Sequence, residues 1–461
     1  MINPRTYDAY RLLHDGILAL ARAEQQGIRV DTDYVDRKQH HLLRKIERIR
    51  TKFKESPFYQ EWQASVKGEI NIDSHVQLSN YLYKIKKIPP QKLTAKGSGS
   101  TDKEALAQLD IPELTTLLET KKYKKLYDVL NDFKTEQVNG IIHPFFSLNN
   151  VVSFRSSSDS PNFQNIPKRD EESMLICRKA LFPRPGHQLL EIDYSGLEVR
   201  IAACYHKDPT MLRYINDPNS DMHTDMTLQI FKLDAFDKTK HSSLRSAVKN
   251  GFVFPQFYGD YYVNCAKSMA CNWGGLPQGG WKTHQGIEID TAFTLGAHLI
   301  SKGINSLDKF TRHVERIERD FWNVRFPDYA DWKDRWWKTY QKHGHIDLFT
   351  GFRCYGPMGR NDCINYPVQG AAFHCLLWSF IRLDQIMREE NWKTKLIGQI
   401  HDAIVLDVHP DELDYVAQVV HRVTCDDLPK AWSWIVVPLE VDMEVCSVDG
   451  SWADKENYTL K

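Results

Sequence analysis

The chain lacks an excess of charge of either sign: its 461 residues carry 60 Lys and Arg against 60 Asp and Glu. A net charge of zero excludes binding to nucleic acid through overall positive charge. It is compatible with a local basic groove, because phosphate contacts depend on where the cations lie. The chain also lacks a run of about 18 apolar residues and a signal-peptide pattern after Met1. We therefore expect a cytoplasmic protein with no membrane partner.

Paired cysteines and internal repeats are missing as well. The nine cysteines include no CxxC pair, and the closest two are Cys265 and Cys271. This spacing argues against a zinc site and favours free thiols in a reducing cytoplasm. Because 461 residues are too many for one ordinary core, we expect two or three subdomains.

Helical periodicity dominates the N-terminal part of the chain. A helix that breaks at Gly27 is expected to bury one apolar face, made of Leu12, Leu13, Ile17, Leu18, Leu20 and Ala21. A charge-rich helix is expected at 34–54, a polar loop at 91–103 and a further helix at 113–131. The last helix carries Lys121, Lys122, Lys124 and Lys125. These lysines form either a solvated helix face or a surface that follows a phosphate backbone.

From about residue 141 the pattern changes to short β-like runs. Residues 187–193 are predicted as a strand, and residues 395–408 as two strands around a turn. A mostly helical block at 208–340 separates them. The pattern predicts a helical arm followed by a β-containing platform with a helical insertion.

Two aspartates stand at the ends of predicted strands: Asp193 in LLEIDYSGLEVR and Asp402 in GQIHDAIVLDV. An aspartate at the end of an apolar run is costly to bury without a partner, so a metal ion or a hydrogen-bond network is expected there. Carboxylates suit hard ions such as Mg²⁺, and phosphoryl transfer uses such ions. Taken singly, each aspartate is more typical of a cap or a turn.

Several segments, in their order along the chain, resemble the motifs of family A DNA polymerases, the bacterial polymerase I type. DYSGLEVRIAA resembles the first polymerase motif, LRSAVKNGFVFPQFYGD the second and QIHDAIVLDV the third. FRSSSDSPNFQNIPKR and INYPVQGAAFH resemble segments that contact primer and template. LALARAEQQGIRVD and VPLEVDMEVCSVDGSW fit the two ends, so the resemblance covers nearly all of the chain.

The resemblance implies an α+β, right-hand polymerase fold with an antiparallel palm sheet and helical fingers and thumb. The N-terminal segment and thumb are expected at 1–140, the palm at 141–207 and 341–461, and the fingers at 208–340. The implied activity is that of a template-directed DNA polymerase, which adds deoxynucleoside triphosphates to a primer 3′ end by two-metal phosphoryl transfer. The implied cofactor is two Mg²⁺ ions, for which Mn²⁺ can substitute, and the implied partners are primer-template DNA and dNTPs.

The resemblance also assigns roles to individual residues. Asp193, Asp402 and the backbone carbonyl of Tyr194 are implied as metal ligands, and Lys249 is implied to help protonate the leaving pyrophosphate. The implied nucleotide-binding residues are Glu198, His223, Arg245, Lys249, Phe254 and Tyr258. The implied DNA-binding residues are Arg155, Asn162, Gln164, Asn365, Gln369 and His401.

Glu198 occupies the position that blocks a ribose 2′-hydroxyl, so the resemblance implies deoxynucleotides as substrates. The alternative for Glu198 is a surface ion pair with Arg200 or another neighbour.

The sequence departs from the family pattern at two places. Ala403 stands where the third motif has Glu, so Asp193 and Asp402 are expected to hold both ions, and Asp407 cannot be placed beside them. In the second motif the step from Lys249 to Phe254 is one residue longer than the family's step of four. One extra residue turns a helix by about 100°. We therefore predict a bulge or kink between 250 and 255, where Pro255 also interrupts the hydrogen bonding. The rival is an unbroken helix with Val253 and Phe257 at the regular positions.

Three further expectations follow from the sequence. No segment for a 3′–5′ exonuclease domain precedes the thumb, so proofreading is expected to be absent, to come from a separate protein or to have been lost by truncation. A non-catalytic DNA-binding or scaffold protein and a single-subunit RNA polymerase are the alternative functions. Retention of both aspartates argues against the scaffold, and Glu198 and the thumb-type N-terminal region argue against the RNA polymerase. The segment DYADWKDRWWKTY is expected to pack as a helix, with base stacking as the alternative.

Overall fold

The computed structural model describes residues 5–460 apart from 91, 95, 108, 110, 169, 272–279, 285, 291 and 292. The chain forms two compact units: 1–41, 126–218 and 327–461 make the first, and 42–125 and 219–326 the second. The long helices α2 (Thr32–Lys54) and α6 (Pro112–Glu136) contain two of the points at which the chain passes between units. The four-part division expected from the sequence stays a prediction.

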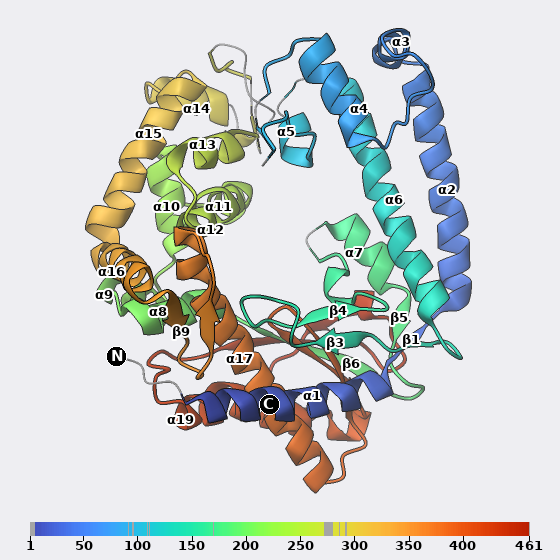
Figure 1. Ribbon diagram of the computed structural model, residues 1–461, viewed down its shortest axis with the longest axis vertical. Helices are drawn as coiled ribbons and strands as arrows, with labels where there is room; N and C mark the ends of the chain where they lie inside the picture. The colour runs from blue at the N-terminus through green and yellow to red at the C-terminus, as the bar shows by residue number, and fades with distance from the viewer. Residues whose placement is uncertain are drawn as a thin grey trace. The chain divides into compact units, whose positions relative to one another are not determined.

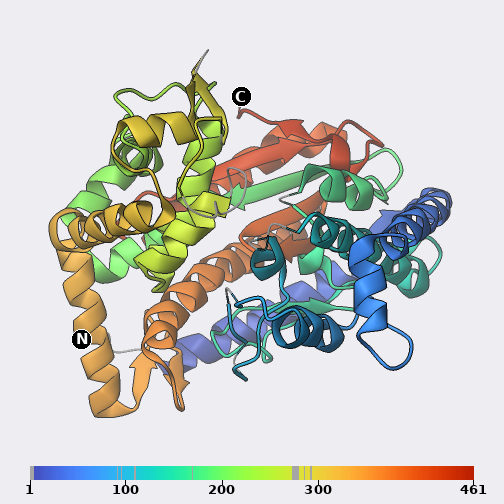
Figure 2. The same cartoon turned by 90° about the horizontal axis from the view of Figure 1, so that it is seen from above.

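A five-stranded antiparallel sheet forms the centre of the first unit, in the order β11-β12-β6-β13-β14. Its strands are β11 (Lys395–Ile400), β12 (Ala403–Val408), β6 (Gln188–Tyr194), β13 (Val441–Val445) and β14 (Glu456–Asn457). Figure 2 shows β6, in green, beside the red C-terminal strands. The strands predicted at 187–193 and 395–408 are confirmed, and so is the α+β fold class.

Helix α1 (Thr6–Gln26) packs against β11 and against the long helix α17 (Arg360–Glu389), which it crosses in Figure 1. Its buried residues are Ala9, Leu12, Gly16, Ala19, Leu20 and Ala23. The predicted apolar face was therefore wrong in part: Leu12 and Leu20 are buried, but Ile17 is 54% exposed and Leu18 44% exposed. Small residues face α17 because the two helices approach closely; a Cβ on Gly16 would lie 2.9 Å from Leu377.

Further α-helices of the first unit lie before, between and after the strands of this sheet in the chain. They are α7 (Glu171–Arg178), α8 (Leu197–His206), α9 (Pro209–Asn216), α16 (Pro327–His343), α18 (Leu413–His421) and α19 (Leu428–Ala431). Short strand pairs complete the unit: β1 (Ile28–Val30) with β2 (Ile141–Ile142) and β5 (Leu181–Phe182), β3 (Phe145–Ser147) with β4 (Ser157–Asp159), and β9 (His345–Asp347) with β10 (Arg353–Tyr355). The tryptophan-rich segment is α16, and Tyr329 and Trp332 on it are buried, which confirms the helix-packing interpretation.

The second unit is mainly helical. Between 42 and 125 it contains α3 (Pro57–Ala64), α4 (His75–Ser79), the π-helix η1 (Asn80–Ile85) and α5 (Lys103–Ala107), around a core that includes Trp62 and Tyr81. Between 219 and 326 it contains α10 (Met222–Phe231), α11 (Ser242–Val248), η3 (Lys249–Val253), α12 (Phe254–Tyr258), α13 (Tyr262–Cys271), β7 (Glu288–Asp290), β8 (Phe293–Thr294), α14 (Leu295–Ser301), α15 (Leu307–Asp320) and η4 (Phe321–Arg325).

The lysine cluster of α6 has a structural role in part. Lys124 of α6 and Arg50 of α2 both pair with the carboxylate of Asp73, at 2.9 Å and 2.8 Å. Burial lowers the pKa of Lys121. These contacts link the two helices, and binding to a phosphate backbone stays a prediction.

The helix that carries the second motif contains the predicted bulge. Residues 249–253 form a π-helix, in which the N–H of Phe254 donates to the carbonyl of Lys249, five residues earlier. This wider turn absorbs the extra residue between Lys249 and Phe254. Pro255 lies in the first turn of α12, where its missing N–H is tolerated. The predicted bulge is confirmed, and an unbroken α-helix over 245–258 is excluded.

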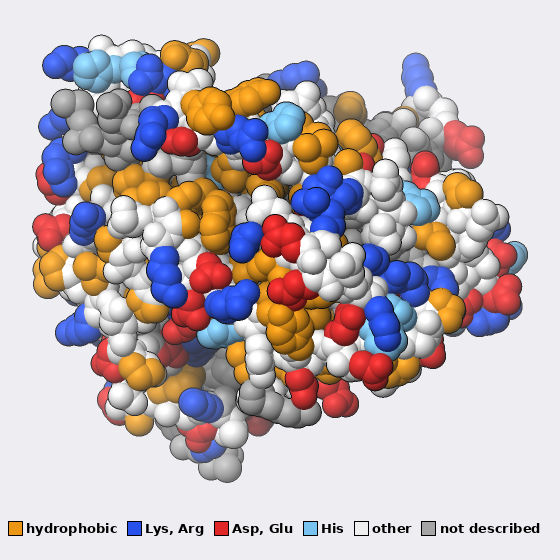
Figure 3. All heavy atoms as spheres, turned by 90° about the horizontal axis from the view of Figure 1, so that it is seen from below, with side chains coloured by type: hydrophobic (Ala, Val, Ile, Leu, Met, Phe, Trp, Pro, Cys, Tyr) orange, Lys and Arg blue, Asp and Glu red, His pale blue; other side chains and the backbone are white. Residues whose placement is uncertain are grey.

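Three further observations concern the cysteines, the charged side chains and the apolar character of the helices. The eight cysteines whose side chains the structure describes are free, and all but Cys425 are buried; the side chain of Cys271 lies outside this set. Acidic and basic side chains are interspersed over the face shown in Figure 3, as a net charge of zero would suggest. Among the described residues, no helix combines the length and the apolar character needed to cross a membrane.

One buried carboxylate caps two helices of the first unit. Asp208 is fully buried, and its Oδ1 accepts hydrogen bonds from the N–H groups of Thr210 (2.9 Å) and Met211 (3.2 Å) at the start of α9. Its Oδ2 accepts from Asp328 (3.1 Å) and Tyr329 (3.2 Å) at the start of α16. Both capped helices belong to the first unit, so Asp208 joins the part of that unit that ends at 218 to the part that begins at 327.

Replacing Asp208 with alanine is expected to lower the free energy of unfolding by about 2–4 kcal/mol, because each lost cap costs about 0.5–2 kcal/mol and leaves buried N–H groups unpaired. Asp208→Asn keeps one acceptor oxygen and should lose about half as much. Urea denaturation monitored by tryptophan fluorescence measures both. An alanine variant within about 0.5 kcal/mol of wild type would contradict the double-cap interpretation.

Candidate active site

The register of the core sheet brings Asp193 and Asp402 together. Asp193 lies near the end of β6, and its direct partner on β12 is Ala403. Asp402 precedes Ala403 in the two-residue turn between β11 and β12, where His401 adopts a positive φ of 53°. The N–H of Tyr194 donates to the carbonyl of Asp402 at 3.1 Å. The turn is therefore fixed beside the end of β6 by the sheet itself.

The carboxylate of Asp402 is half-buried and lies near other charged groups. Burial raises its pKa, and the nearby Asp193 adds to this rise, while Arg155 and Lys168 oppose it. Within the described part of the chain, no N–H or O–H group donates a hydrogen bond to this carboxylate. A half-buried carboxylate without a donor is stabilised by a bound cation. Among the described residues, no group of three or more His, Cys, Asp or Glu side chains is arranged to hold a metal ion. Mg²⁺ sites in proteins often have only one or two carboxylates and complete their ligands with water.

Two basic side chains accompany the aspartates. The Nζ of Lys168 lies 2.5 Å from Oδ2 of Asp193. Arg155 forms an ion pair with Glu198. Arg200, the neighbour proposed as the alternative partner of Glu198, instead pairs with Glu440 and donates to the carbonyls of Ser195 and Pro438. Arg200 is therefore not the partner of Glu198, and the ion pair with Arg155 agrees with the other branch of that alternative, a different neighbour.

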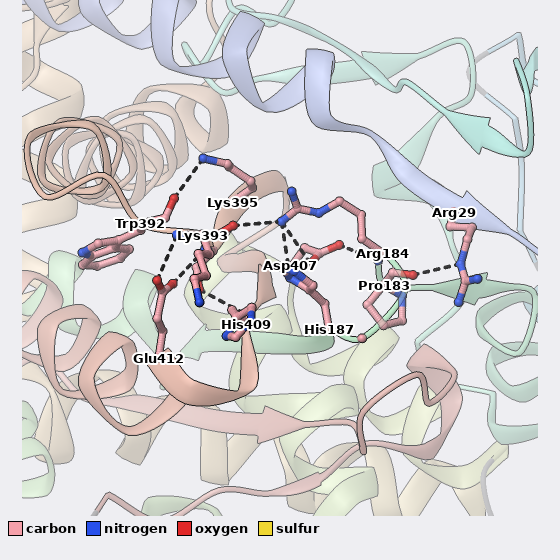
Figure 4. Close-up of polar contacts among 12 residues, drawn as sticks. Arg29, Pro183, Arg184, His187, Trp392, Lys393, Lys395, Asp407, His409 and Glu412 are labelled. Carbon is pink, nitrogen blue, oxygen red and sulfur yellow. Dashed lines mark hydrogen bonds and ion pairs between the residues drawn. The ribbon is translucent and has the colours of Figure 1, made fainter.

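Asp407 does not take the place of the glutamate that the family's third motif has at the position of Ala403. It pairs with Leu189, toward the opposite end of the β6–β12 ladder from Asp193. Its buried carboxylate accepts from the N–H and guanidinium of Arg184 at 2.7 Å and 3.3 Å and lies 2.8 Å from Nδ1 of His187 (Figure 4). These contacts give Asp407 a structural role within the sheet.

Sequence reasoning overlooked a third acidic residue at this end of the sheet. Asp442 of β13 is the direct partner of Asp193 on the side opposite Ala403. Directly paired residues of antiparallel strands project from the same face, so Asp442 shares the face of Asp193. Its exposed carboxylate accepts a hydrogen bond from the Ser195 hydroxyl at 2.7 Å. The alternation of apolar and acidic residues in LEVDMEV could have predicted a strand with Asp442 on one face. Only the strand register shows that this face is the one that carries Asp193.

A buried charge network supports the aspartate end of β6. Glu191, two residues before Asp193 on the same face, accepts hydrogen bonds from Arg178 (2.8 Å), Trp452 (2.9 Å) and Lys455 (2.7 Å). Burial alone would raise the pKa of Glu191, but the charges of Arg178 and Lys455 outweigh it and lower the pKa to about 2. The Arg178 guanidinium also lies over the Trp452 ring, 4.3 Å from its centroid.

Within the second unit, the predicted nucleotide-binding residues of α10, α11 and η3 form one cluster. Arg245 donates two hydrogen bonds to Asp221, at 2.7 Å and 3.0 Å, and Asp221 caps the N-terminus of α10. The ring of Phe254 meets His223 edge to face at 5.7 Å, and Nζ of Lys249 lies 5.4 Å from its centroid. The π-turn thus keeps Phe254 on the same side of the helix as Lys249.

His223 is neutral at physiological pH within this cluster. Burial lowers its pKa to about 4, and the charges of Arg245 and Lys249 act in the same direction. Its Nδ1 is buried and has no hydrogen-bond partner among the described residues. Tyr258 is 41% exposed and ends α12, just before Gly259 with a φ of 90°.

The predicted DNA-binding residues all belong to the first unit. Asn162 caps a short 3₁₀-helix, η2 (Phe163–Asn165), and Gln164 donates to the Ser156 hydroxyl at 2.8 Å. Asn365 and Gln369 lie one turn apart on α17. His401 is exposed in the turn that carries Asp402. Their roles stay predictions.

A family model described as DNA polymerase family A matches residues 34–273 and 323–454. The chain belongs to DNA polymerase family A.

Relatives in this family are bacterial. The chain is 27% identical to DNA polymerase I of Caldicellulosiruptor bescii over 88% of its own length and 43% of that protein. It is 27% identical to DNA polymerase I of Aquifex aeolicus over 87% of its own length and 61% of that protein. The chain thus spans about half the length of these relatives.

The fold agrees with the family. A solved structure of the polymerase domain of Pol1 from M. smegmatis, in complex with DNA primer-template and dNTP, matches with a TM-score of 0.73 at 21% identity. The match covers 95% of this chain and 70% of that one. In this family A chain, the first and third motifs supply Asp193 and Asp402, and the second supplies the cluster around Phe254.

Proposed function

We propose that this family A chain is a template-directed DNA polymerase, which adds deoxynucleoside triphosphates to a primer 3′ end by two-metal phosphoryl transfer. The observation that carries the proposal is the position of the β11–β12 turn beside β6, which pairs Asp193 with a carboxylate, Asp402, that has no hydrogen-bond donor among the described residues. We propose Mg²⁺ as the ion, with Mn²⁺ as a substitute, and Asp193, Asp402 and the Tyr194 carbonyl as its protein ligands.

Asp193 and Asp402 would hold the divalent ions, which would lower the pKa of the primer 3′-hydroxyl and neutralise charge on the reacting phosphates. The protein's own cations bind the rest of the triphosphate. Arg245 and Lys249 lie four residues apart on α11 and the start of η3, and Lys249 is the candidate proton donor to the leaving pyrophosphate. Neutral His223 can donate a hydrogen bond to a phosphate oxygen without adding charge.

The DNA-binding residues proposed for this chain recognise shape rather than sequence. Arg155, Asn365, Gln369 and His401 carry donors suited to the minor groove, where the acceptors are nearly the same for every correct base pair. Such contacts would test the geometry of the newly formed pair without regard to its identity.

Primer extension tests the proposal against the two alternative functions. Purified full-length protein is incubated with primer-template DNA and Mg²⁺, with either dNTPs or NTPs, and with EDTA as the metal-free arm. We expect template-directed extension with dNTPs and none with EDTA. Binding of the DNA without extension would indicate a scaffold protein, and extension with NTPs in preference to dNTPs would indicate an RNA polymerase.

Glu198→Ala is expected to raise the incorporation of ribonucleotides relative to deoxynucleotides by about 100-fold, which corresponds to about 2.7 kcal/mol. The reason is that alanine opens the space in which Glu198 would exclude a 2′-hydroxyl. Single-nucleotide incorporation with dNTP and NTP pairs gives the ratio. Glu440→Ala is the matched control, since it also removes an acidic partner of an arginine, Arg200, and should leave the ratio unchanged. An unchanged ratio in Glu198→Ala would refute the assignment.

A further inference from the structure

One basic side chain contacts a carboxylate of the proposed metal site. Lys168 follows the buried Ile166 and the half-buried Pro167, and its Nζ lies 2.5 Å from Oδ2 of Asp193. The Nζ of Lys168 also lies 3.9 Å from Oε1 of Glu191. The other carboxylate oxygen of Glu191, Oε2, already accepts hydrogen bonds from Arg178, Trp452 and Lys455. Asp193 is therefore the principal partner of Lys168.

We infer that Lys168 is a built-in counter-ion of the metal site: its ammonium neutralises Asp193 in the metal-free protein and is displaced when a divalent ion binds. Lys168 would then set the affinity of the site for metal ions. The inference rests on the proposed function for the identity of Asp193 as a ligand, and it adds a residue outside the ligand set.

The exposure of the pair makes the exchange feasible. The side chain of Lys168 is 46% exposed and that of Asp193 35%, so water can solvate both groups once they separate. Exposed ion pairs contribute little to stability and are readily exchanged. By contrast, the Arg178–Glu191 pair is 1% and 2% exposed, and separating it would leave buried charges without partners. The flexible lysine stem lets the ammonium move away while the backbone of the 154–168 segment stays in place.

The charge balance of this end of the sheet gives the ammonium a reason to be there. The negative charge of Asp193 acts unfavourably on the Asp402 carboxylate, and the positive charges of Lys168 and Arg155 oppose this effect. A divalent ion supplies the same compensation more strongly, because it carries twice the charge at the same oxygens. A divalent ion at Asp193 and an ammonium 2.5 Å from Oδ2 of the same carboxylate repel each other, so metal binding favours the state in which the Lys168 ammonium has moved away.

Direct metal binding tests the inference. Mn²⁺ is titrated into the full-length, metal-free protein without DNA or nucleotide, and free Mn²⁺ is measured by electron paramagnetic resonance. Removal of a competing cation and of its repulsion is expected to tighten Mn²⁺ binding by about fivefold to tenfold in Lys168→Met. Lys168→Arg keeps the charge and should bind Mn²⁺ no more tightly than wild type. Binding by Lys168→Met that equals or falls below wild type would overturn the inference.

The chain offers a matched control for this titration. Lys134 and Asp36 form an ion pair in the same unit at 2.6 Å, with side chains 49% and 46% exposed. Lys134→Met removes an equivalent lysine at a different carboxylate and should leave Mn²⁺ binding unchanged. Asp193→Asn should weaken binding in both the wild-type and the Lys168→Met background, which shows that the Mn²⁺ ion is at Asp193.

Chemical labelling measures the displacement itself. Lysines are acetylated with an N-hydroxysuccinimide ester with and without Mg²⁺, and the rates at Lys168 and Lys134 are read from peptides by mass spectrometry. Mg²⁺ should accelerate acetylation at Lys168 several-fold and leave Lys134 unchanged. A Lys168 rate that Mg²⁺ does not raise would overturn the inference. Because both measurements omit DNA and dNTPs, a failure here and a failure of primer extension are distinguishable results.

Discussion

Asp402→Asn is expected to slow primer extension by about 10³-fold or more, which corresponds to about 4 kcal/mol of transition-state stabilisation. Asparagine keeps the size of the side chain but removes the charge that would hold a metal ion beside Asp193. Ala403 leaves no carboxylate at the neighbouring position, and Asp407 is held by Arg184 and His187. Single-turnover extension with saturating primer-template measures the effect, and Asp193→Asn should behave alike.

The same substitution should leave folding and DNA binding intact. Because the pKa of Asp402 is raised in the folded protein, its ionised form opposes folding above the unfolded pKa. Asp402→Asn should therefore raise the stability of the metal-free protein at pH 7, and fluorescence anisotropy should show primer-template affinity within a few-fold of wild type. Asp442→Asn is the control on the same face of the sheet. It is expected to change the rate of primer extension by less than about threefold, or about 0.6 kcal/mol. Extension by Asp402→Asn at the wild-type rate would refute the metal assignment.

Glu191→Gln is expected to lower the free energy of unfolding of the first unit by about 3–5 kcal/mol. The substitution leaves the buried Arg178 guanidinium and the Lys455 ammonium without their shared negative partner, at side-chain exposures of 1% and 11%. Urea denaturation monitored by tryptophan fluorescence, to which Trp452 contributes, measures this loss. Glu444→Gln is the matched control: Glu444 also pairs with Lys455 but is 35% exposed, so the expected loss is about 1 kcal/mol or less.

The pH dependence of stability gives an independent measure of the same network. The pKa of Glu191 is lowered from 4.5 to about 2 in the folded protein. A carboxyl with a lowered folded pKa contributes stability above its unfolded pKa and loses it as the pH falls through the folded pKa. Wild type should therefore lose part of its stability between pH 4.5 and pH 2, and Glu191→Gln should lack this part. Identical pH profiles for the two proteins would show that Glu191 is not the group that titrates.

Local features of this protein were predictable from its sequence, because each depends on residues close together in the chain. The strands β6, β11 and β12 follow from short apolar runs, and the turn at Asp402 follows from the polar pair that separates two of them. The π-turn follows from a five-residue step and one proline. Both aspartates stand at the ends of apolar runs, whereas the residues of the Phe254 cluster were assigned by resemblance to the family's motifs.

Contacts between distant segments were decided only by the tertiary structure. The buried face of α1 depends on how closely α17 approaches Gly16, which the periodicity of α1 cannot reveal. The double cap of Asp208 joins it to residues about 120 positions later, and the Lys168–Asp193 pair joins a loop to a strand end. Strand register placed Asp442 beside Asp193 and Asp407 far from it. Sequence thus determined which groups are available for the chemistry, whereas packing and register determined which charges meet, because a one-residue change in register would reverse the face on which every one of them lies.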